Sequence, residues 1–565
     1  MTATACSSNT VSAESAIPGQ WWHHPGIIFL ATVALFFVYA GDAPPGVNEA
    51  HYLVKAKNFW DASWCHEDLF VRSGKAHAFF YWVFGWPTQF VSLTTTAWIG
   101  RLVAWSMIAC GLVRLTASLR IPLAYTLVIA TVWLAGIQHG NLAGEWVIGG
   151  IEAKVPAYGL VLMGIVELIH RRWNRVWLYF GLASAFHVLT GGWSVVAGAI
   201  AFVLLEKSPW KQPSNARFFT PGLFGGGAIS LLGLIPALAM SSGVSSAESI
   251  SAAKTYAYFR ISHHLLPSAF HFDWYVRHAV LTLTAATLLI ALIRNGRPQN
   301  SNPILALTAF AFGAVSIALL GLLVGILPAV SPDWGARLLR FYWFRLADAV
   351  TPLALACAVA CWLQAGTEAV AMKPRFSLVW IARGITVVAV ILVGQTTWIN
   401  VSGGVPISLS NRLLGLHSKA DYGSQRRTVS DWIKVCRFVR ANTDEDAVLL
   451  TPRHQQTFKW YAHRAEVVNW KDIPQDAPSL REWARRFVEI FPTELSTMRV
   501  TIRYDKLRHF RERYGVDWMI VDRRVVGPHL PLVQVYPLDN EHNHTYAVYR
   551  LPSSLIAIPT DRDPR

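Results

Sequence analysis

Charged residues are scarce in this chain. Only 15% of its 565 residues are Asp, Glu, Lys or Arg, whereas soluble domains carry roughly 25%. Hydrophobic residues make up 53% of the chain, and the mean hydropathy is +0.33. This composition excludes an ordinary soluble protein, and most of the chain is expected to lie in a membrane.

Cysteine is also scarce, and the six that occur form no Cys-x-x-Cys pair. Only Cys65 and Cys436 are expected on the oxidising side of a membrane, where a disulfide is possible but two unpaired thiols are favoured. The other four lie in or before apolar segments: Cys6, Cys110, Cys357 and Cys361. Residues 1–22 lack the basic region and the cleavage site of a secretory signal, so the first apolar segment is expected to remain as a span.

The chain is basic, with a formal net charge of +16, which would also suit a nucleic-acid partner. Many of its Lys and Arg residues, however, flank apolar segments, as anchoring on the cytoplasmic side requires. The 25 Trp and 17 Tyr residues suit the two interfaces of a bilayer, because their rings combine an apolar body with a polar tip. We therefore expect a lipid bilayer as the partner, and no nucleic acid.

Apolar runs of about 20 residues identify membrane spans, and eleven are expected here. They are residues 26–40, 98–115, 121–138, 155–169, 176–190, 193–205, 218–240, 279–293, 304–327, 346–363 and 378–398. Residues 77–93 are also apolar, but Gly85 and Pro87 interrupt them, and they are interpreted as a surface or re-entrant helix. This choice places the short basic turns and residues 1–25 in the cytoplasm of a bacterium, with the spans in its inner membrane.

Residues 399–565 are charged and contain no spanning run. Helices are expected at residues 429–441, 455–462, 480–491 and 504–514, and strands at residues 447–451, 466–470, 518–522 and 545–551. This alternation predicts an extracytoplasmic α/β domain. It contains no Gly-rich phosphate loop, Walker motif or zinc-ligand spacing. The expected fold class is thus a mostly α polytopic membrane protein with a C-terminal α/β domain.

Acidic residues gather in the loop that follows the first span, residues 42–96. Residues 44–46 make a stiff turn, and from Glu49 onward residues recur at helical spacing. The pattern predicts a carboxylate at the start of a short helix on the membrane surface. Glu49 is therefore the catalytic candidate, with helix capping as the alternative. Three neighbours are candidates for substrate binding: Asp42, His51 and Tyr52.

Two further outer loops carry more ionisable residues than solubility requires. Glu152 and Lys154 close the second loop, where they bind substrate or neutralise each other. The fourth loop contributes Arg260, His263 and His264. Adjacent histidines diverge on a helix and no third ligand stands at metal spacing, so a phosphate contact or a surface role is favoured over a metal.

Arg340, Arg345 and Asp348 lie where the fifth loop enters the membrane. Ionisable residues at such depth are usually functional or paired. The three residues form an ion-pair network between helix ends, or the arginines hold a phosphate or diphosphate through bidentate contacts. His187, inside a span, is expected to be a hydrogen-bonded core residue.

Two segments carry a resemblance to a known family. NEAHYLVKAKNFW resembles the first-loop motif of the GT-C superfamily of polytopic membrane glycosyltransferases, in which an acidic residue precedes a Tyr and a helix of small residues. YWVFGWPTQF and WIGRLVAWSMIACGLVRL are similar to the surface helix and the Arg-led second span of that group. The first third of the chain matches best. TPRHQQTFKWYAHRAEVVNWKDIP is more similar to uncharacterised bacterial membrane proteins of this kind.

The resemblance implies transfer of a sugar from a polyprenyl-phosphate donor to a lipid, glycan or protein outside the membrane. The acid of the first-loop motif corresponds to Glu49 alone, because Asn48 stands where the group commonly has Asp. The second loop offers Glu145 and Glu152 without a paired-acid motif. A divalent metal cofactor therefore has no ligand motif to support it.

The chemistry of such a transfer makes two demands. A carboxylate must take the proton of the acceptor, which Glu49 would do. Cations must stabilise the leaving phosphate, a role open to Lys154, Arg260, Arg340 and Arg345. The alternative functions are a transporter or flippase, which would carry polar residues deep within its spans, and a structural or sensory protein whose outer domain binds a partner while the spans only anchor it. Ionisable residues near the span ends favour a reaction at the membrane surface.

Overall fold

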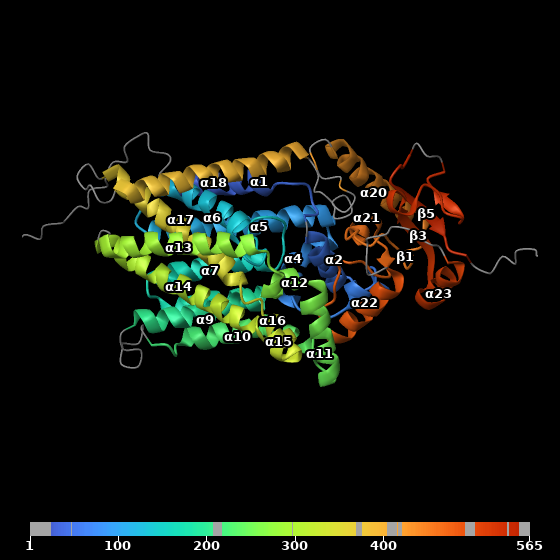
Figure 1. The fold of residues 1–565 in the computed structure, drawn as a ribbon, viewed down its shortest axis with the longest axis horizontal. Coiled ribbons are helices and arrows are strands. Elements are labelled where there is room, and N and C mark those ends of the chain that lie inside the picture. The colour runs from blue at the N-terminus through green and yellow to red at the C-terminus, as the bar shows by residue number, and fades with distance from the viewer. Residues whose placement is uncertain are drawn as a thin grey trace, which may run out of the picture.

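Each of the eleven apolar segments forms a helix of the bundle in Figure 1. These helices are α1 (Pro25–Ala40), α5 (Leu93–Ser118), α6 (Tyr125–Gly140), α7 (Lys154–Ile169), α8 (Trp173–Phe186), α9 (Val188–Leu205), α10 (Pro221–Ala239), α13 (Phe272–Asn295), α14 (Pro298–Val324), α17 (Arg345–Glu368) and α18 (Phe376–Gly403). The structure is a computed structural model that describes residues 24–46, 48–206, 217–295, 298–368, 376–403, 415, 418, 421–491, 503–538 and 542–552.

The lengths of these helices identify a multi-pass membrane protein. Seven of them are long and apolar enough to cross a bilayer: α5, α9, α10, α13, α14, α17 and α18. The other four are shorter, with 16 residues in α1, α6 and α7 and 14 in α8, and α1 is apolar throughout. All eleven predicted segments are therefore helical, and seven of them meet the criteria for a span on their own.

Burial separates a central helix from helices that face outward. In α17, 94% of the apolar window is buried, whereas the figure is 17% for α10 and 22% for α13 and α18. Apolar side chains on the outer surface are what contact with lipid requires. Helices α8 and α10 can approach closely because Gly181 has no side chain. A Cβ at this position would lie only 2.2 Å from the carbonyl oxygen of Gly226. Such contacts between small residues are common between membrane helices.

Short helices connect the spans at the end of the bundle that bears the C-terminal sheet. The first loop contains α2 (Glu49–Trp60), α3 (Leu69–Arg72) and α4 (Ala78–Gly85), followed by a 3₁₀ turn at Trp86–Gln89. The fourth loop contains α11 (Ser246–Lys254), a π-helical turn at Thr255–Arg260 and α12 (Ser262–Leu265), and the fifth contains α15 (Leu327–Val330) and α16 (Pro332–Leu339). With eight residues, α4 is too short to cross a bilayer, which agrees with a surface helix at residues 77–93.

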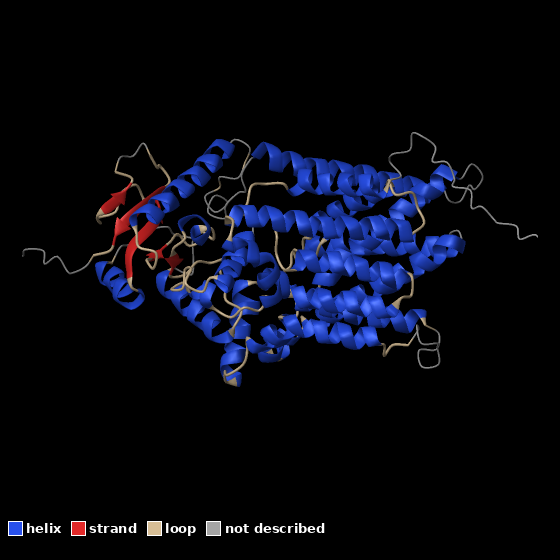
Figure 2. Ribbon diagram, turned by 180° about the vertical axis from the view of Figure 1, so that it is seen from behind, coloured by secondary structure: helices blue, strands red, loops and turns tan. Residues whose placement is uncertain are grey.

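The C-terminal part forms a five-stranded sheet with helices on both faces (Figure 2). Its elements are α20 (Tyr422–Asn442), β1 (Val448–Leu450), α21 (Phe458–Ala462), β2 (Ala465–Glu466), α22 (Ala477–Ile490), α23 (Tyr504–Tyr514), β3 (Val516–Asp522), α24 (Arg523–Val526), β4 (Gln534–Tyr536) and β5 (Tyr546–Arg550). The strand order is β2-β1-β3-β5-β4, parallel among the first three and antiparallel in β3-β5-β4. The predicted α/β domain is present.

The alternation of side chains along the strands places one apolar core on each face of the sheet. Ile520 of β3 packs against α20, while its neighbour Met519 packs on the side of α22 and α23. Two sequence predictions needed adjustment. The strand expected at residues 466–470 is only the two residues of β2, because the chain then turns toward the membrane part. Strand β4 was not predicted.

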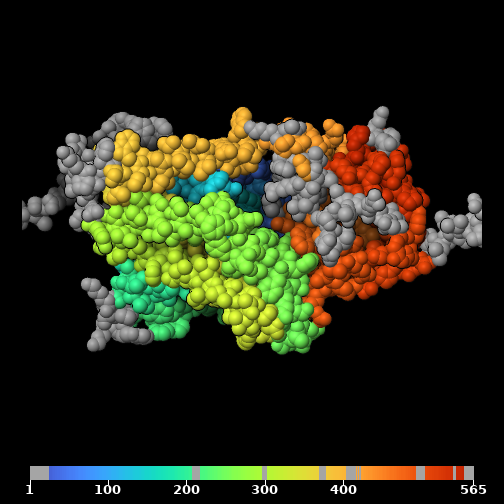
Figure 3. Space-filling model, viewed as in Figure 1, coloured from blue at the N-terminus to red at the C-terminus, as the bar shows by residue number. Residues whose placement is uncertain are grey.

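The domain docks on the loops of the bundle (Figure 3). The backbone N–H of Ala477 donates to the carbonyl of Met240 at 3.1 Å, and that of Gly74 to Asp476 Oδ2 at 2.8 Å. The backbone N–H of Glu466 donates to Asp68 Oδ2 at 3.1 Å. The last two bonds join segments about 400 residues apart, so the first loop and the domain form one continuous structure.

The cysteines follow the favoured expectation. Cys65, Cys110, Cys357, Cys361 and Cys436 are all free thiols. Cys65 and Cys436, the two expected on the oxidising side, are both buried. Cys6 lies outside the described residues.

Candidate functional site

Glu49 begins α2 and is fully buried. Its carboxylate accepts hydrogen bonds from Arg101 Nε at 2.6 Å and Arg101 Nη2 at 2.5 Å. It also accepts from the backbone N–H of Ile151 at 2.8 Å and of Gly46 at 2.6 Å. A carboxylate offers about four lone-pair positions, and these four donors occupy them. Glu49 would have to lose one of these bonds before it could accept a proton from a substrate.

Two glycines allow the chain to close around this ion pair. A Cβ on Gly150 would lie 2.6 Å from Glu49 Cγ, and one on Gly46 would lie 3.3 Å from Arg101 Nη2. Arg101 also donates through Nη1 to the backbone carbonyl of Asp42. Burial raises the pKa of the Asp42 carboxyl. It is thus the backbone carbonyl of Asp42, and not its carboxyl group, that contacts Arg101.

Ionisable side chains form a chain of contacts from the first loop to the fifth. Asn48 Nδ2 donates to Glu152 Oε2 at 3.3 Å, and Glu152 Oε1 lies 3.2 Å from Lys154 Nζ. Lys154 Nζ also lies 2.9 Å from Glu145 Oε1, and Glu145 Oε2 lies 2.9 Å from Arg345 Nε. Two cations and two anions alternate here. The mutual neutralisation expected of Glu152 and Lys154 is present, and it extends to two more residues.

Arg345 is held on several sides. Its Nη1 lies 2.8 Å from His187 Nε2, and Nδ1 of that histidine accepts from the backbone N–H of Thr190 at 3.2 Å. His187 is thus the hydrogen-bonded core residue that was expected. The guanidinium also lies 4.2 Å above the ring of Tyr342, whose φ of +51° is left-handed. Strained backbone of this kind clusters at functional sites.

The expected network among Arg340, Arg345 and Asp348 does not form. Asp348 accepts instead from the backbone N–H groups of Leu142 at 2.8 Å and Ala143 at 2.9 Å. Arg345 pairs with the second loop, as described above, and Arg340 pairs with no carboxylate in the described part of the chain. The second loop thus provides the partners of both Arg345 and Asp348.

Arg260 is a buried cation without a carboxylate partner. It ends the π-helical turn of the fourth loop, a rare geometry that recurs at functional sites. Its Nε donates to the carbonyl of Trp470 at 2.7 Å, and the guanidinium lies 4.7 Å above the Trp470 ring. Among the residues that the structure describes, no carboxylate lies within ion-pair distance of it. Desolvation lowers the pKa of Arg260 to about 10.

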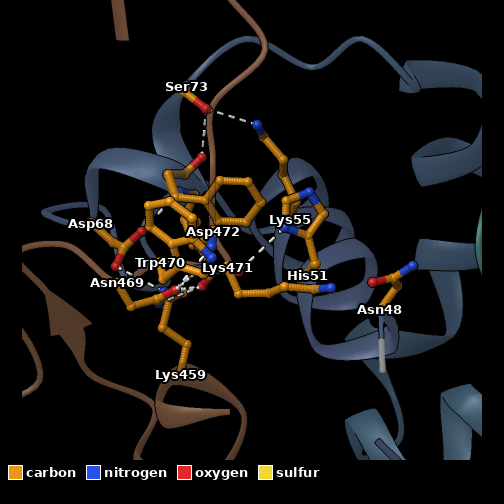
Figure 4. A network of polar contacts seen from close by, with 12 residues as sticks. Asn48, His51, Lys55, Asp68, Ser73, Lys459, Asn469, Trp470, Lys471 and Asp472 are labelled. Carbon is orange, nitrogen blue, oxygen red and sulfur yellow. Dashed lines mark hydrogen bonds and ion pairs between the residues drawn. The ribbon is translucent and has the colours of Figure 1, made fainter. Parts of the chain in front are cut away.

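Lys471 is a second cation of this kind, from the C-terminal domain. Its side chain extends toward the end of α2 that carries Asn48 (Figure 4). Burial, and then the charge of Arg260, lower the pKa of Lys471 to about 8. Glu152 and Asp472 act on its ammonium group only from beyond ion-pair distance. Arg260 and Lys471 therefore bring two positive charges from different parts of the chain to one place.

The adjacent histidines of α12 point to different surroundings. His264 Nδ1 donates to the carbonyl of Ala143 at 2.5 Å, and burial lowers the pKa of His264 to about 3. His263 is exposed at the surface, and partial desolvation, followed by the charges of Arg260 and Lys471, lowers its pKa. Within the described ranges, no group of three or more His, Cys, Asp or Glu side chains is arranged to hold a metal ion.

A second buried cluster lies where the first loop meets the C-terminal domain (Figure 4). Lys459 Nζ lies 2.5 Å from Glu466 Oε1, 2.7 Å from Asp472 Oδ2 and 3.3 Å from Asp68 Oδ2. Burial, together with the charges of Asp472 and Asp68, raises the pKa of Glu466 to about 7, although Lys459 acts to lower it. The pKa of Asp472 stays well below its usual range, because Lys459 and His51 outweigh the effect of burial.

His51 and Tyr52 face different parts of the site. His51 Nδ1 lies 3.3 Å from Asp472 Oδ1, and its ring centroid lies 4.3 Å from that of Phe70. The Tyr52 ring lies 5.4 Å from that of His77. Burial, and then the nearby charge of Glu152, raise the pKa of Tyr52 well above its ordinary value. Consecutive positions on α2 thus connect the membrane part and the C-terminal domain.

The structure gathers most of the expected site residues at this junction. Asp42 and Asp348 are the exceptions, since their contacts are mainly with backbone. Six residues of the ionisable clusters were not among the candidates: Asp68, Glu145, Lys459, Glu466, Lys471 and Asp472. The last four lie in the C-terminal domain and become relevant only because that domain folds back onto the first loop.

Comparisons with known proteins give one family match and several structural ones. Residues 430–490, from α20 to the end of α22, match a family described as a domain of unknown function, DUF6798. No curated protein matches the chain in sequence.

Among solved structures, the chain is similar to ArnT from Cupriavidus metallidurans bound to undecaprenyl phosphate, with 12% identity, a TM-score of 0.49 and coverage of 94% of this chain and 98% of that one. It is also similar to the oligosaccharyltransferase of Archaeoglobus fulgidus in complex with Zn and sulfate, with 11% identity, a TM-score of 0.41 and coverage of 88% and 67%. A further similar structure is the oligosaccharyltransferase AglB of the same archaeon in complex with an inhibitory peptide and a dolichol-phosphate. Its sequence identity is 10%, its TM-score is 0.39, and the match covers 89% of this chain and 69% of that one. Each of these is a similarity of structure at low sequence identity.

Proposed function

We propose that this protein is an integral membrane glycosyltransferase that transfers a sugar from a polyprenyl-phosphate donor to a lipid, glycan or protein on the outer face of the membrane. The observation that carries the proposal is the pair of cations Arg260 and Lys471. They converge at the junction of the loops and the C-terminal domain without a carboxylate to balance them.

A cation removed from water is costly unless an anion compensates it. The lowered pKa values of Arg260 and Lys471 express that cost. A bound phosphate would offset it, and the planar guanidinium of Arg260 suits the oxygens of a phosphate. Among the other cations, Lys154 and Arg345 already have carboxylate partners, Lys55 donates to Ser73, and Arg340 is less buried than Arg260. Arg260 and Lys471 are therefore the residues proposed to hold the phosphate.

The position of the pair suits an anion carried by a lipid. The fourth loop, which bears Arg260, leads directly into α13, and the prenyl tail would lie against apolar faces of the membrane helices. One apolar groove, of about 630 Å³, opens between α1, α5, α7 and α8. The basic turn between α7 and α8, with Arg171, Arg172 and Arg175, lies at the other end of α7 from Lys154. The positive-inside rule favours the cytoplasm for that end, and this supports a site on the outer face.

The site also offers what the reaction demands. As the bond between the sugar and the phosphate breaks, negative charge develops on the phosphate, and preorganised cations stabilise it. The C-terminal domain, which contributes Lys471 and the Trp470 platform for Arg260, would cover the donor and exclude water. Glu49 and Arg101 would hold the first loop in the shape that presents α2 to the substrates.

Binding and turnover test the proposal separately. Purified protein is titrated with undecaprenyl phosphate, and thermal stabilisation reports binding. Arg260→Gln and Lys471→Met should each weaken binding about tenfold or more. The matched control is Arg277→Gln, because Arg277 is exposed and pairs with Asp273 at the surface. Unchanged binding in both site variants would refute the assignment of the phosphate site.

Turnover is measured by incubating the protein with a panel of polyprenyl-phosphate sugars and a membrane-lipid extract, and by detecting free polyprenyl phosphate by mass spectrometry. A glycosyltransferase releases it with one donor of the panel. A transporter or flippase, the alternative from the sequence, binds the lipid and releases nothing. Binding without release from any donor would therefore favour transport.

A further inference from the structure

The contact between His51 and Asp472 joins the first loop to the C-terminal domain at a titratable pair (Figure 4). His51 lies in the first turn of α2, and its ring packs at 4.3 Å on Phe70. Its Nδ1 lies 3.3 Å from Asp472 Oδ1. The ring is therefore fixed in orientation by an apolar neighbour from the first loop and by a carboxylate from the other end of the chain.

Asp472 is itself held in place and kept ionised. Its second oxygen lies 2.7 Å from Lys459 Nζ and accepts from Asn469 Nδ2 at 3.0 Å, and its backbone N–H donates to Asn469 Oδ1 at 2.9 Å. An ionised carboxylate only accepts hydrogen bonds. It therefore selects the tautomer of neutral His51 that carries its proton on Nδ1, and the lone pair is left on Nε2.

The Nε2 atom of His51 is free to meet a substrate. No hydrogen bond to it is found among the described residues. The charged and titratable groups that face the ring are Asp472, Lys471, Lys55 and His77. Burial, and then the charges of Lys55 and Lys471, outweigh Asp472 and lower the pKa of His51. The imidazole is consequently neutral near pH 7, the form that can accept a proton.

Glu49 offers the opposite arrangement on the same helix. Its lone pairs are occupied by Arg101 and two backbone N–H groups, whereas His51 keeps one nitrogen available. Both residues were candidates from the sequence. Their hydrogen bonds distinguish them, because only His51 has an atom available to accept a proton from a substrate.

We propose that His51 is the general base of the transfer reaction and that Asp472 is its positioning residue. This inference rests on the proposed function. As the oxygen of an acceptor hydroxyl bonds to the anomeric carbon, its proton passes to His51 Nε2. The bond between that carbon and the phosphate oxygen breaks, and its electron pair leaves with the polyprenyl phosphate, next to Lys471 and Arg260. The resulting imidazolium is stabilised by Asp472 and later releases its proton to water.

The first test compares His51→Gln with the control His66→Gln, an exposed histidine of the same loop. His51→Gln should lower kcat by about 10²–10⁴, the usual effect of removing a general base, and should leave the affinity for undecaprenyl phosphate within about twofold. His66→Gln should change neither. An active wild-type protein whose His51→Gln variant retains its kcat within threefold would overturn the assignment of the base. A wild-type protein that is inactive with every donor, although it is folded, would instead overturn the proposed function and the base with it.

A second measurement reads His51 without relying on turnover. Diethyl pyrocarbonate reacts with neutral imidazole nitrogens, and peptide mass spectrometry gives the modification rate of each histidine as a function of pH. His51 should react at pH 7 and be protected by undecaprenyl phosphate, and its rate should fall only at a pH below the ordinary range for histidine. No reaction at His51 in folded protein would contradict a free Nε2.

Asp472 is tested by the pH profile. In Asp472→Asn the acidic limb of kcat/KM should move to lower pH, because the carboxylate that favours the imidazolium is gone, and kcat should fall through loss of the correct tautomer. If Asp472 only supports the fold, Asp472→Asn would lower the amount of folded protein and leave the acidic limb of kcat/KM at the same pH.

Discussion

Glu49 and Arg101 form a two-point ion pair that is buried on both sides, with side-chain exposures of 0% and 1%. Nε and Nη2 of the arginine donate to separate oxygens of the carboxylate at 2.6 and 2.5 Å. The pair joins the start of α2 to the third turn of α5. Because both charges are out of water, the loss of either partner leaves the other uncompensated.

Glu49→Gln should therefore destabilise the folded protein strongly. Breaking a buried pair from one side typically costs about 3–5 kcal/mol, and a lower unfolding temperature in detergent would show it. Glu67→Gln, which alters an exposed carboxylate of the same loop, should leave the unfolding temperature unchanged. A Glu49→Gln protein that unfolds like the wild type but has lost activity would return Glu49 to the role of catalytic base.

Gly150→Ala should disturb the same pair from the other side. The new Cβ would lie 2.6 Å from Glu49 Cγ, and that side chain cannot move without breaking its bonds to Arg101. Overpacking of this kind costs about 1–3 kcal/mol. Gly192→Ala in α9 is the control, because its Cβ would meet nothing within 4 Å. Equal stability of the two variants would contradict the close packing around Glu49.

The docking of the C-terminal domain should depend on pH through Glu466. The folded protein raises the pKa of Glu466 to about 7, so the folded state binds a proton more tightly than the unfolded chain, in which the group titrates near 4.3. Stability from this group is thus fully present below about pH 4.3 and declines as the pH rises toward 7. The difference in unfolding temperature between the wild type and Glu466→Gln should therefore decrease as the pH rises through this window. A difference independent of pH would contradict the raised pKa of Glu466.

Arg260→Lys should weaken the binding of undecaprenyl phosphate about tenfold, although it preserves the charge. Lysine can neither donate through Nε to the Trp470 carbonyl nor present a planar group to the Trp470 ring, as Arg260 does at 2.7 and 4.7 Å. The two cations differ in this respect. Titration of the variant beside Arg277→Lys measures the effect. Equal affinities would mean that only the charge of Arg260 matters.

Hydropathy and the basic turns were sufficient to locate the helices of the membrane part. Each of the eleven apolar runs became a helix, because a backbone in lipid must satisfy its hydrogen bonds internally. The surface helix at residues 77–93 was also predicted, because Gly85 and Pro87 interrupt the run. Weak local signals failed elsewhere. β4 has three residues and β2 has two, and such strands are defined by their neighbours in the sheet more than by their own sequence.

The candidate site was predicted only in part, for a different reason. Residues beside membrane boundaries, such as Lys154, Arg260 and Arg345, stand out because charge is rare there. Lys471 and Asp472 lie in a domain where charge is common, and nothing in their local sequence separates them from solvated residues. Their role depends on how the domain docks onto the first loop, which a single sequence does not specify.

The hydrogen bond between Glu466 and Asp68 joins residues 398 positions apart. It can therefore form only late in the synthesis of the chain. At a synthesis rate of about 5–20 residues per second, the first loop waits roughly 20–80 s for the residues that complete it. During that interval Asp68 and His51 lack their partners from the C-terminal domain. The site is therefore completed last. A chain whose synthesis stops before residue 459 would have its membrane helices but would lack the residues that the C-terminal domain contributes to the site.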